Sequence, residues 1–213
     1  MTLTAVEVRV LGALVEKEMA TPEYYPLTLN ALLNACNQKS NRDPAVSYDE
    51  DTVAEAIDSL REKRLAAVIT GAGMRVPKYR ELLSESLNLG RRELAILCEL
   101  MLRGPQTVGE LRDRAGRLHP FADLDEVESI LRRLMEWQPD PLAVRLARQP
   151  GTKEQRNAHL LSGEPAAAAS AEAPPEVPAR GERLAALEAE VRELRNEVRA
   201  LGERLDKFRA QFE

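Results

Sequence analysis

The chain has few aromatic residues for its length. Phe, Trp and Tyr account for 4% of its 213 residues, whereas hydrophobic residues as a whole account for 44%. Aliphatic side chains must therefore form most of the core, and a core with so few large rings favours shallow binding surfaces over a deep catalytic cavity. This scarcity is a first indication against an enzyme.

Cysteine and histidine are also scarce. Cys36 and Cys98 lie alone in apolar stretches, and His119 and His159 are forty residues apart, so no pair has the spacing of metal ligands. No Gly-rich phosphate loop and no nucleophile with a nearby base accompanies them. We expect these four residues to have core or surface roles, with no metal, no cofactor and no catalytic residue.

Long apolar runs are missing as well. No stretch of about 18 apolar residues occurs, which is the length that a membrane-spanning helix needs. Glu7 and Arg9 interrupt the first apolar stretch, so a signal peptide is not indicated either. We therefore expect a cytoplasmic protein with reduced cysteines and no membrane partner.

The chain has no excess of positive charge. It contains 30 Lys and Arg residues against 35 Asp and Glu residues, a formal net charge of -5. Strong nucleic-acid binders usually have basic domains, because neutralising phosphates dominates their affinity. Any binding to DNA must therefore depend on local clusters of cations.

The sequence does contain one helical pattern twice. In the first helix of each copy, Leu11 and Leu14 match Leu97 and Leu100 at an offset of 86 residues. In the third helix the offset is 74, and the matching apolar residues are Val53, Ile57, Leu60, Val127, Leu131 and Leu134. The offset shrinks only between helices, where loops absorb insertions.

A two-strand hairpin is predicted after each third helix. The first has strands at 65–69 and 74–79, and the second at 142–146 and 157–161. Three helices followed by a hairpin are the order of a winged helix. The sequence thus predicts an α+β, mostly helical protein with two tandem winged-helix domains, then a linker and a C-terminal coiled-coil helix.

The predicted domain bounds follow from these patterns and from changes in composition. The short apolar connector between the two domains indicates that they pack together. The bounds are 1–81 for the first winged-helix domain, 82–90 for the connector, 91–163 for the second winged-helix domain, 164–181 for an Ala/Pro-rich disordered linker, and 182–213 for the coiled-coil helix.

Acidic residues begin both third helices. Ser47 to Glu50 has the Ser-x-x-Glu form of a capping box, and Asp123 with Glu126 is its acidic relative. In a DNA-binding winged helix this end enters the major groove, where acids would repel phosphates. The helix dipole explains the acids without DNA, since each stabilises a helix start by about 0.3–1 kcal/mol.

Basic residues gather instead in the polar loop after the second helix, at the end of the first third helix, and on the hairpins. Such cations can hold phosphates without reading sequence, although ordinary solvated surface explains them equally well. The candidate nucleic-acid-binding residues are Lys39, Asn41, Arg42, Arg61, Lys63, Arg64, Arg75, Lys78, Arg145, Arg148, Lys153 and Arg156.

The C-terminal helix has a regular apolar seam with alternating spacings of three and four, which is typical of a coiled coil. We expect a homodimer through this helix, and the orientation of its strands stays open; the alternatives are a partner helix or a helix folded back on its own domains. The seam residues are Leu184, Leu187, Val191, Leu194, Val198, Leu201, Leu205, Phe208 and Phe212.

Two stretches resemble the signature of the YceH family of uncharacterised bacterial proteins. They are Tyr24 to Leu32, and the distinctive Asn-Gln-Lys-Ser-Asn-Arg-Asp-Pro run that ends at Pro44. The resemblance covers about residues 3–163 and implies tandem winged-helix domains. It implies no catalytic residues, and it points to the polar loop as the place of a shared task.

Two functions fit these observations. The leading hypothesis is a non-enzymatic bacterial binding protein, a DNA-associated or regulatory factor that contacts the phosphates of duplex DNA through its loop and wing cations. The alternative is a protein–protein interaction scaffold whose acidic third helices meet a basic partner. The sequence identifies neither the ligand nor any DNA sequence preference.

Overall fold

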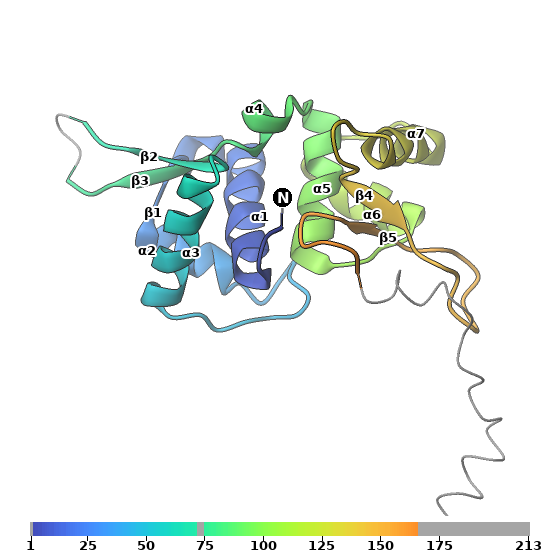
Figure 1. Cartoon of the computed structure of the whole chain (residues 1–213), viewed down its shortest axis with the longest axis horizontal. Coiled ribbons are helices and arrows are strands. Elements are labelled where there is room, and N and C mark those ends of the chain that lie inside the picture. The colour runs from blue at the N-terminus through green and yellow to red at the C-terminus, as the bar shows by residue number, and fades with distance from the viewer. Residues whose placement is uncertain (1, 72–74, 166–213) are drawn as a thin grey trace, which may run out of the picture. The chain divides into compact units, whose positions relative to one another are not determined.

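The computed structural model describes residues 2–71 and 75–165, and within these ranges the chain is an α+β protein dominated by helices (Figure 1). This confirms the predicted class. The predicted coiled-coil seam from Leu184 to Phe212, and all but the first two residues of the predicted linker, lie outside the described residues.

The first half of the protein combines three helices with a small antiparallel sheet. The strand order is β1-β3-β2, with Tyr79 of the central strand paired to both Leu27 and Val68. The elements in chain order are α1 (Ala5–Ala20), the 3-10 turn η1 (Pro22–Tyr24), β1 (Leu27–Thr28), α2 (Leu29–Cys36), α3 (Glu50–Glu62), β2 (Ala66–Ile69) and β3 (Lys78–Glu81).

The second half has the same order after a short connecting helix. A single bridge between Gln106 and Asn157 stands where the first half has β1, so the chain again runs helix, strand position, helix, helix, strand, strand. The elements are α4 (Leu83–Leu87), α5 (Arg91–Arg103), α6 (Val108–Ala115), α7 (Leu124–Met135), β4 (Ala143–Arg145) and β5 (Asn157–His159). The twofold pattern in the sequence is therefore a structural repeat.

The strand bounds differ from the prediction in the first hairpin. The return strand was expected at 74–79, but β3 runs from Lys78 to Glu81. Pro77 directly precedes it and has no backbone N–H to donate to a ladder, so pairing begins only after it. The second return strand is shorter than predicted and ends at His159.

Helix starts show one error and one confirmation. The cap of α3 is Asp49 and not Ser47, because the Asp49 carboxylate accepts a hydrogen bond from the Thr52 amide at 2.8 Å. Asp123 caps α7 as expected, accepting from the amide of Glu126 at 2.8 Å. Full capping boxes occur elsewhere, at the starts of α1 and α6.

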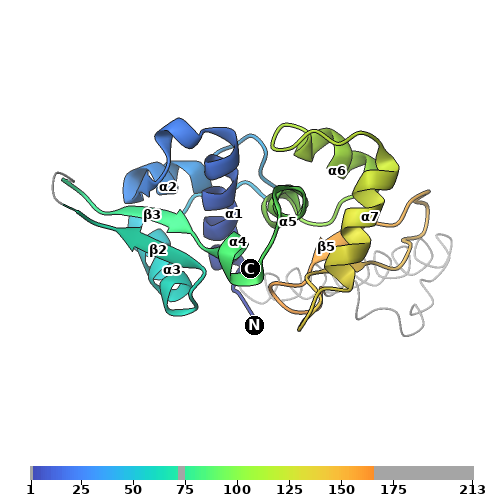
Figure 2. The ribbon, with the colours of Figure 1, turned by 90° about the horizontal axis from the view of Figure 1, so that it is seen from above.

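The equivalent first helices of the two halves, α1 and α5, lie side by side at the centre of the protein (Figure 2). A Cβ atom added at Gly12 of α1 would lie 2.9 Å from Leu102 Cδ2 and 3.2 Å from Met101 Cβ, so a larger residue at this position would force side chains of α5 to shift. Cys98 of α5 donates from its thiol to the Gly12 carbonyl at 3.5 Å. One continuous core results, which confirms the prediction that the halves pack together.

Candidate functional site

The polar loop between α2 and α3 folds back onto α1 and does not expose its arginine. Arg42 is 6% exposed, and its Nη1 and Nη2 atoms lie 3.1 Å and 2.5 Å from the two carboxylate oxygens of Glu16. It also donates to the carbonyl of Ala35 at 2.8 Å. The expectation that Arg42 is a surface cation for phosphates is wrong, because its charge is neutralised inside the protein.

The same carboxylate joins the two halves. Arg117, which follows α6, places Nη2 2.7 Å from Glu16 of α1 and 2.7 Å from Glu99 of α5. Burial would raise the pKa of Glu16, but the hydrogen bond and charge of Arg42 and the charge of Arg117 lower it below its usual value. This four-residue network, with Glu16, Arg42 and Glu99 buried and Arg117 partly exposed, is hereafter the central ion network.

Other residues of the polar loop are partly engaged. The side chain of Asn37 closes the loop by exchanging two hydrogen bonds of 2.8 Å with the backbone of Tyr48. Asn41 accepts from Arg103 at 3.1 Å, in a left-handed backbone conformation. Lys39 is exposed and forms no ion pair within residues 2–71 and 75–165. Of the three loop candidates, Lys39 is thus the one at the surface with its charge available.

The basic cluster at the end of α3 is also divided. Lys63 forms an ion pair with Glu7 of α1, and the Ser59 hydroxyl donates to the same carboxylate at 2.6 Å. Burial would raise the pKa of Glu7, but these partners lower it to about 2. Arg61 pairs with Asp58 at 2.6 Å, whereas Arg64 is exposed at the start of the first hairpin.

The first hairpin, made of β2, β3 and the residues between them, is basic. From Arg64, two residues before β2, to the end of β3, the chain contains four cations and one acid, the buried Glu81. Arg80 pairs with Glu85 at 2.6 Å at the base of the hairpin, which leaves Arg64, Arg75 and Lys78 as its contribution to a cationic surface. Arg75 is exposed and Lys78 is half-buried.

The second hairpin, made of β4, β5 and the residues between them, has a similar charge. Residues 145–156 contain four cations and the single acid Glu154. Two of the four are engaged at its base, Arg145 by Glu128 and Arg156 by Glu110. Arg148 and Lys153 are exposed toward its end, and Arg148 donates to the Thr152 carbonyl at 2.7 Å.

A groove of about 420 Å³ lies between α6, α7 and the second hairpin. Leu124 at the start of α7 is 44% exposed in it, which is unusual for a large apolar side chain in the described part of the chain. The acids Asp125, Glu128 and Glu154 line the groove together with Arg145, which forms an ion pair with Glu128. An exposed apolar side chain beside two acids that form no ion pair with a described residue suits a basic partner better than it suits DNA.

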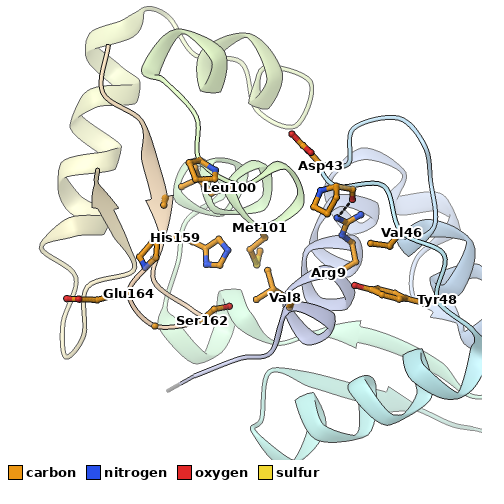
Figure 3. Close-up of a pocket in the computed structure, with 17 residues that line it drawn as sticks. Val8, Arg9, Asp43, Val46, Tyr48, Leu100, Met101, His159, Ser162 and Glu164 are labelled. Carbon is orange, nitrogen blue, oxygen red and sulfur yellow. Dashed lines mark hydrogen bonds between the residues drawn. The ribbon is translucent and has the colours of Figure 1, made fainter. Parts of the chain in front are cut away.

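A more enclosed cavity of about 290 Å³ lies between α1, α5, the polar loop and the end of β5 (Figure 3). Its apolar lining includes Val8, Leu100 and Met101, and its polar lining includes Arg9 and His159. Arg9 is 5% exposed, and burial lowers its pKa below the usual value. Burial also lowers the pKa of His159 to about 4, so the imidazole is neutral at pH 7.

One carboxylate pair stands apart from these sites. Glu18 of α1 lies beside Glu81 of β3, and its burial together with that neighbour raises the pKa of Glu18 to about 7. Ser84 donates to Glu81 from its amide at 2.9 Å and from its hydroxyl, which fixes the second carboxylate. No group of three or more His, Cys, Asp or Glu residues with metal-binding geometry occurs in the part of the chain that the structure covers.

Comparison with known families shows a match over most of the sequence. Residues 3–152 match the family described as "Protein of unknown function, DUF480". The chain belongs to the DUF480 family.

Full-length relatives within the same group are described as UPF0502 proteins. One from Geobacter sulfurreducens is 58% identical over 217 residues, covering 99% of this chain and 98% of its own length. One from Pelobacter propionicus is 57% identical over 219 residues, covering 100% and 99%. One from Opitutus terrae is 58% identical over 176 residues, covering 83% and 76%. This similarity supports the expectation of an uncharacterised family. The names of these relatives state no activity.

In this DUF480 family member, the residues that sequence reasoning missed are mostly acids on helices. Glu16 and Glu99 stand in apolar stretches of α1 and α5, where a buried carboxylate requires a partner. That requirement was the available signal for the central ion network. Among the described residues, no helix combines the length and the apolar character needed to cross a membrane.

Proposed function

We propose that this chain is a non-enzymatic DNA-associated protein whose two halves are winged-helix domains that hold duplex DNA by their hairpins. The separation of charge carries this proposal. Residues 64–81 and 145–156 together contain eight cations and two acids, of which Glu81 is buried, whereas α3 and α7 begin with exposed acids. Support for the fold comes from three helices with a sheet of order β1-β3-β2 in the first half and the same element order in the second.

The charge distribution favours phosphate contacts over base reading. A carboxylate in the major groove can accept only from the amino group of cytosine or adenine and repels both backbones. Cations on a projecting hairpin meet phosphates of any sequence, and each contact releases counterions. We therefore expect binding that depends strongly on salt and weakly on sequence.

The structure narrows the set of residues that would make these contacts. Paired cations would have to leave their carboxylates first, which reduces their value for DNA. Among the candidate residues, the cations without an ion pair to another described residue are Lys39, Arg64, Arg75, Lys78, Arg148 and Lys153.

The test is the salt dependence of binding to a fluorescein-labelled duplex of arbitrary sequence, measured by anisotropy with the full chain. The plot of log K against log salt has a negative slope, to which each phosphate contact contributes about 0.9. Replacing both Arg148 and Lys153 by Ser should therefore make this slope less steep by roughly 1.8. The matched control replaces Arg61 and Arg112 by Ser, which removes the same charge from residues already paired with Asp58 and Asp113.

Two results would overturn the proposal. One is the absence of binding at the lowest salt concentration. The other is an equal change of slope in the hairpin variant and the control, which would show a response to net charge alone.

The groove around Leu124 favours a second function, an interaction scaffold for a basic protein. Its exposed apolar side chain beside Asp125 and Glu154, the two acids of its lining that form no ion pair with a described residue, is typical of a protein-binding surface. Affinity capture with the full chain and with Leu124→Ser separates the two functions. A stoichiometric partner that survives nuclease treatment and is lost in the variant supports the scaffold; loss of every partner on nuclease treatment supports DNA.

We also propose that two copies associate through the C-terminal seam. Leu194→Asp places a charge in that seam, so the mass measured by light scattering should fall from that of a dimer to that of a monomer. Asn196→Asp adds the same charge at a neighbouring position on the predicted outer face of the helix, away from the seam and its flanking positions, and should keep the dimer. An unchanged mass for Leu194→Asp would exclude this segment as the element of association.

A further inference from the structure

Arg9 is a buried cation without an acidic partner. It is 5% exposed, yet its hydrogen bonds go to two backbone carbonyls, those of Pro44 at 2.7 Å and Cys36 at 3.4 Å. A guanidinium has five N–H donors, so these bonds use two of them. Arg42 differs in this respect, because it forms two hydrogen bonds to the carboxylate of Glu16.

The net effect of the surroundings is unfavourable to the charge of Arg9. Burial and then the nearby charge of Arg42 lower the pKa of Arg9, and the charge interactions with Tyr48, Cys36 and Asp43 offset only part of this effect. A buried charge is costly unless an opposite charge accompanies it. Within the described ranges no carboxylate forms an ion pair with Arg9, so a bound anion would stabilise it.

The cavity beside Arg9 has room for such a counter-charge. Its volume of about 290 Å³ is at the lower end for ligand sites, which run from about 300 to 1,000 Å³. Figure 3 shows Val8 and Met101 at its centre, with the ring of His159 turned toward them. The Nδ1 atom of His159 is buried and has no hydrogen-bond partner among the described residues.

Two acids at the edge of the cavity form no ion pair with Arg9. Asp43 and Glu164 line it but are exposed, and their carboxylates point away from Arg9 in Figure 3, although the charge of Asp43 favours the Arg9 cation from a distance. The rest of the lining presents one cation, one neutral imidazole, the hydroxyl groups of Tyr48 and Ser162, and an apolar wall.

We propose that this cavity binds a small monocarboxylate with an apolar body. The carboxylate pairs with the free donors of Arg9, the apolar body lies against Val8, Leu100 and Met101, and His159 provides a neutral polar contact. A dianion such as a phosphate monoester fits less well, because a second negative charge would be buried without a partner. This site is independent of the proposed DNA contacts.

The experiment uses the full chain with ¹³C-methyl-labelled methionine, and follows the Met101 methyl signal during titration with benzoate. Benzamide, of the same shape and without charge, is the matched control, and hexanoate tests a second apolar body. Both carboxylates should shift the signal saturably, and benzamide should bind about 10-fold to 100-fold more weakly, as the loss of a charge-assisted hydrogen bond implies.

Two pairs of variants sharpen the test. Arg9→Lys should keep benzoate binding and Arg9→Gln should weaken it to the level of benzamide. Because either change can disturb the loop through the carbonyls that Arg9 holds, Ala5→Trp provides a second route. Ala5 lines the cavity and is exposed at the start of α1, so tryptophan there should block entry, whereas Ala20→Trp at the far end of the same helix should not.

The proposal is overturned if neither carboxylate shifts the Met101 signal, or if benzamide binds as well as benzoate. It is likewise overturned if Ala5→Trp and Ala20→Trp bind benzoate equally, whatever the behaviour of the Arg9 variants.

Discussion

The two halves share a fold but use their equivalent acids differently. Glu7 on α1 accepts from Ser59 on α3, and Glu93 on α5 pairs with Arg133 on α7 at 2.8 Å. Glu7 and Glu93 differ by the first-helix offset of 86, and Ser59 and Arg133 by the third-helix offset of 74. The repeat thus extends to individual contacts. Where the first half has the serine Ser59 the second has the arginine Arg133, so the equivalent contact is a neutral hydrogen bond in one half and an ion pair in the other.

The central ion network shows the opposite behaviour, because the repeat does not contain it twice. Arg42 reaches Glu16 from an enlarged loop in the first half, whereas Arg117 reaches the same carboxylate directly after α6 in the second. Position 102, which matches Glu16 at the offset of 86, is a buried leucine. The fold follows from the repeated pattern, and the asymmetry between halves follows from their loops.

Of the substitutions considered, Glu16→Leu should have the largest effect on stability, because it breaks the central ion network. It leaves Arg42 buried without its carboxylate, so the free energy of unfolding should fall by about 3–5 kcal/mol. Glu99→Leu is the control, since Arg117 would still pair with Glu16, and the side chain of Arg117 is 31% exposed to solvent. Urea unfolding followed by circular dichroism measures both, and equal losses would contradict the central role of Glu16.

A pair of glycines tests the contact between α1 and α5. Gly12→Ala should destabilise the protein by about 1–3 kcal/mol, because its Cβ would meet Leu102 at 2.9 Å and Met101 Cβ at 3.2 Å. Gly109→Ala in α6 has open space and should stabilise it by about 1 kcal/mol or less. Thermal melting compares them; a shift of the same sign in both variants would mean that the approach of the helices is not tight.

Two acids of α1 should give small pH effects of opposite sign. The pKa of Glu7 is lowered from 4.5 to about 2, so its stabilisation is present above pH 4.5 and lost as pH falls toward 2. The pKa of Glu18 is raised from 4.5 to about 7, so its contribution is present below pH 4.5 and lost as pH rises through 7. Each effect should be on the order of 1 kcal/mol, since Lys63, the partner of the buried Glu7, is 31% exposed and Glu18 is only half-buried.

Unfolding free energies measured across pH 2–8 for Glu7→Gln and Glu18→Gln test this pair. The first variant should flatten the acidic limb of the stability profile and the second should flatten the limb near neutrality. Identical profiles in the two variants would contradict the assigned environments.

Sequence alone predicted the repeat because its apolar spacings survive loop changes, as Leu11 and Leu97 illustrate. It could not predict which cations are free, because pairing depends on contacts far apart in the chain. Lys63 meets Glu7 across 56 residues, and Arg117 meets Glu16 across 101. The cap of α3 was misplaced for a different reason, since Ser47 and Asp49 both suit an N-cap and only the backbone path selects one.

The meeting of Gly12 with Cys98 has a further consequence. When equivalent residues of two copies touch, the copies are related as the subunits of a symmetric dimer are. Here the two halves belong to one chain and are joined by residues 82–90, so their association is intramolecular. Dilution cannot separate them, and the pairing of the two hairpins is fixed at one to one whatever the concentration of the protein.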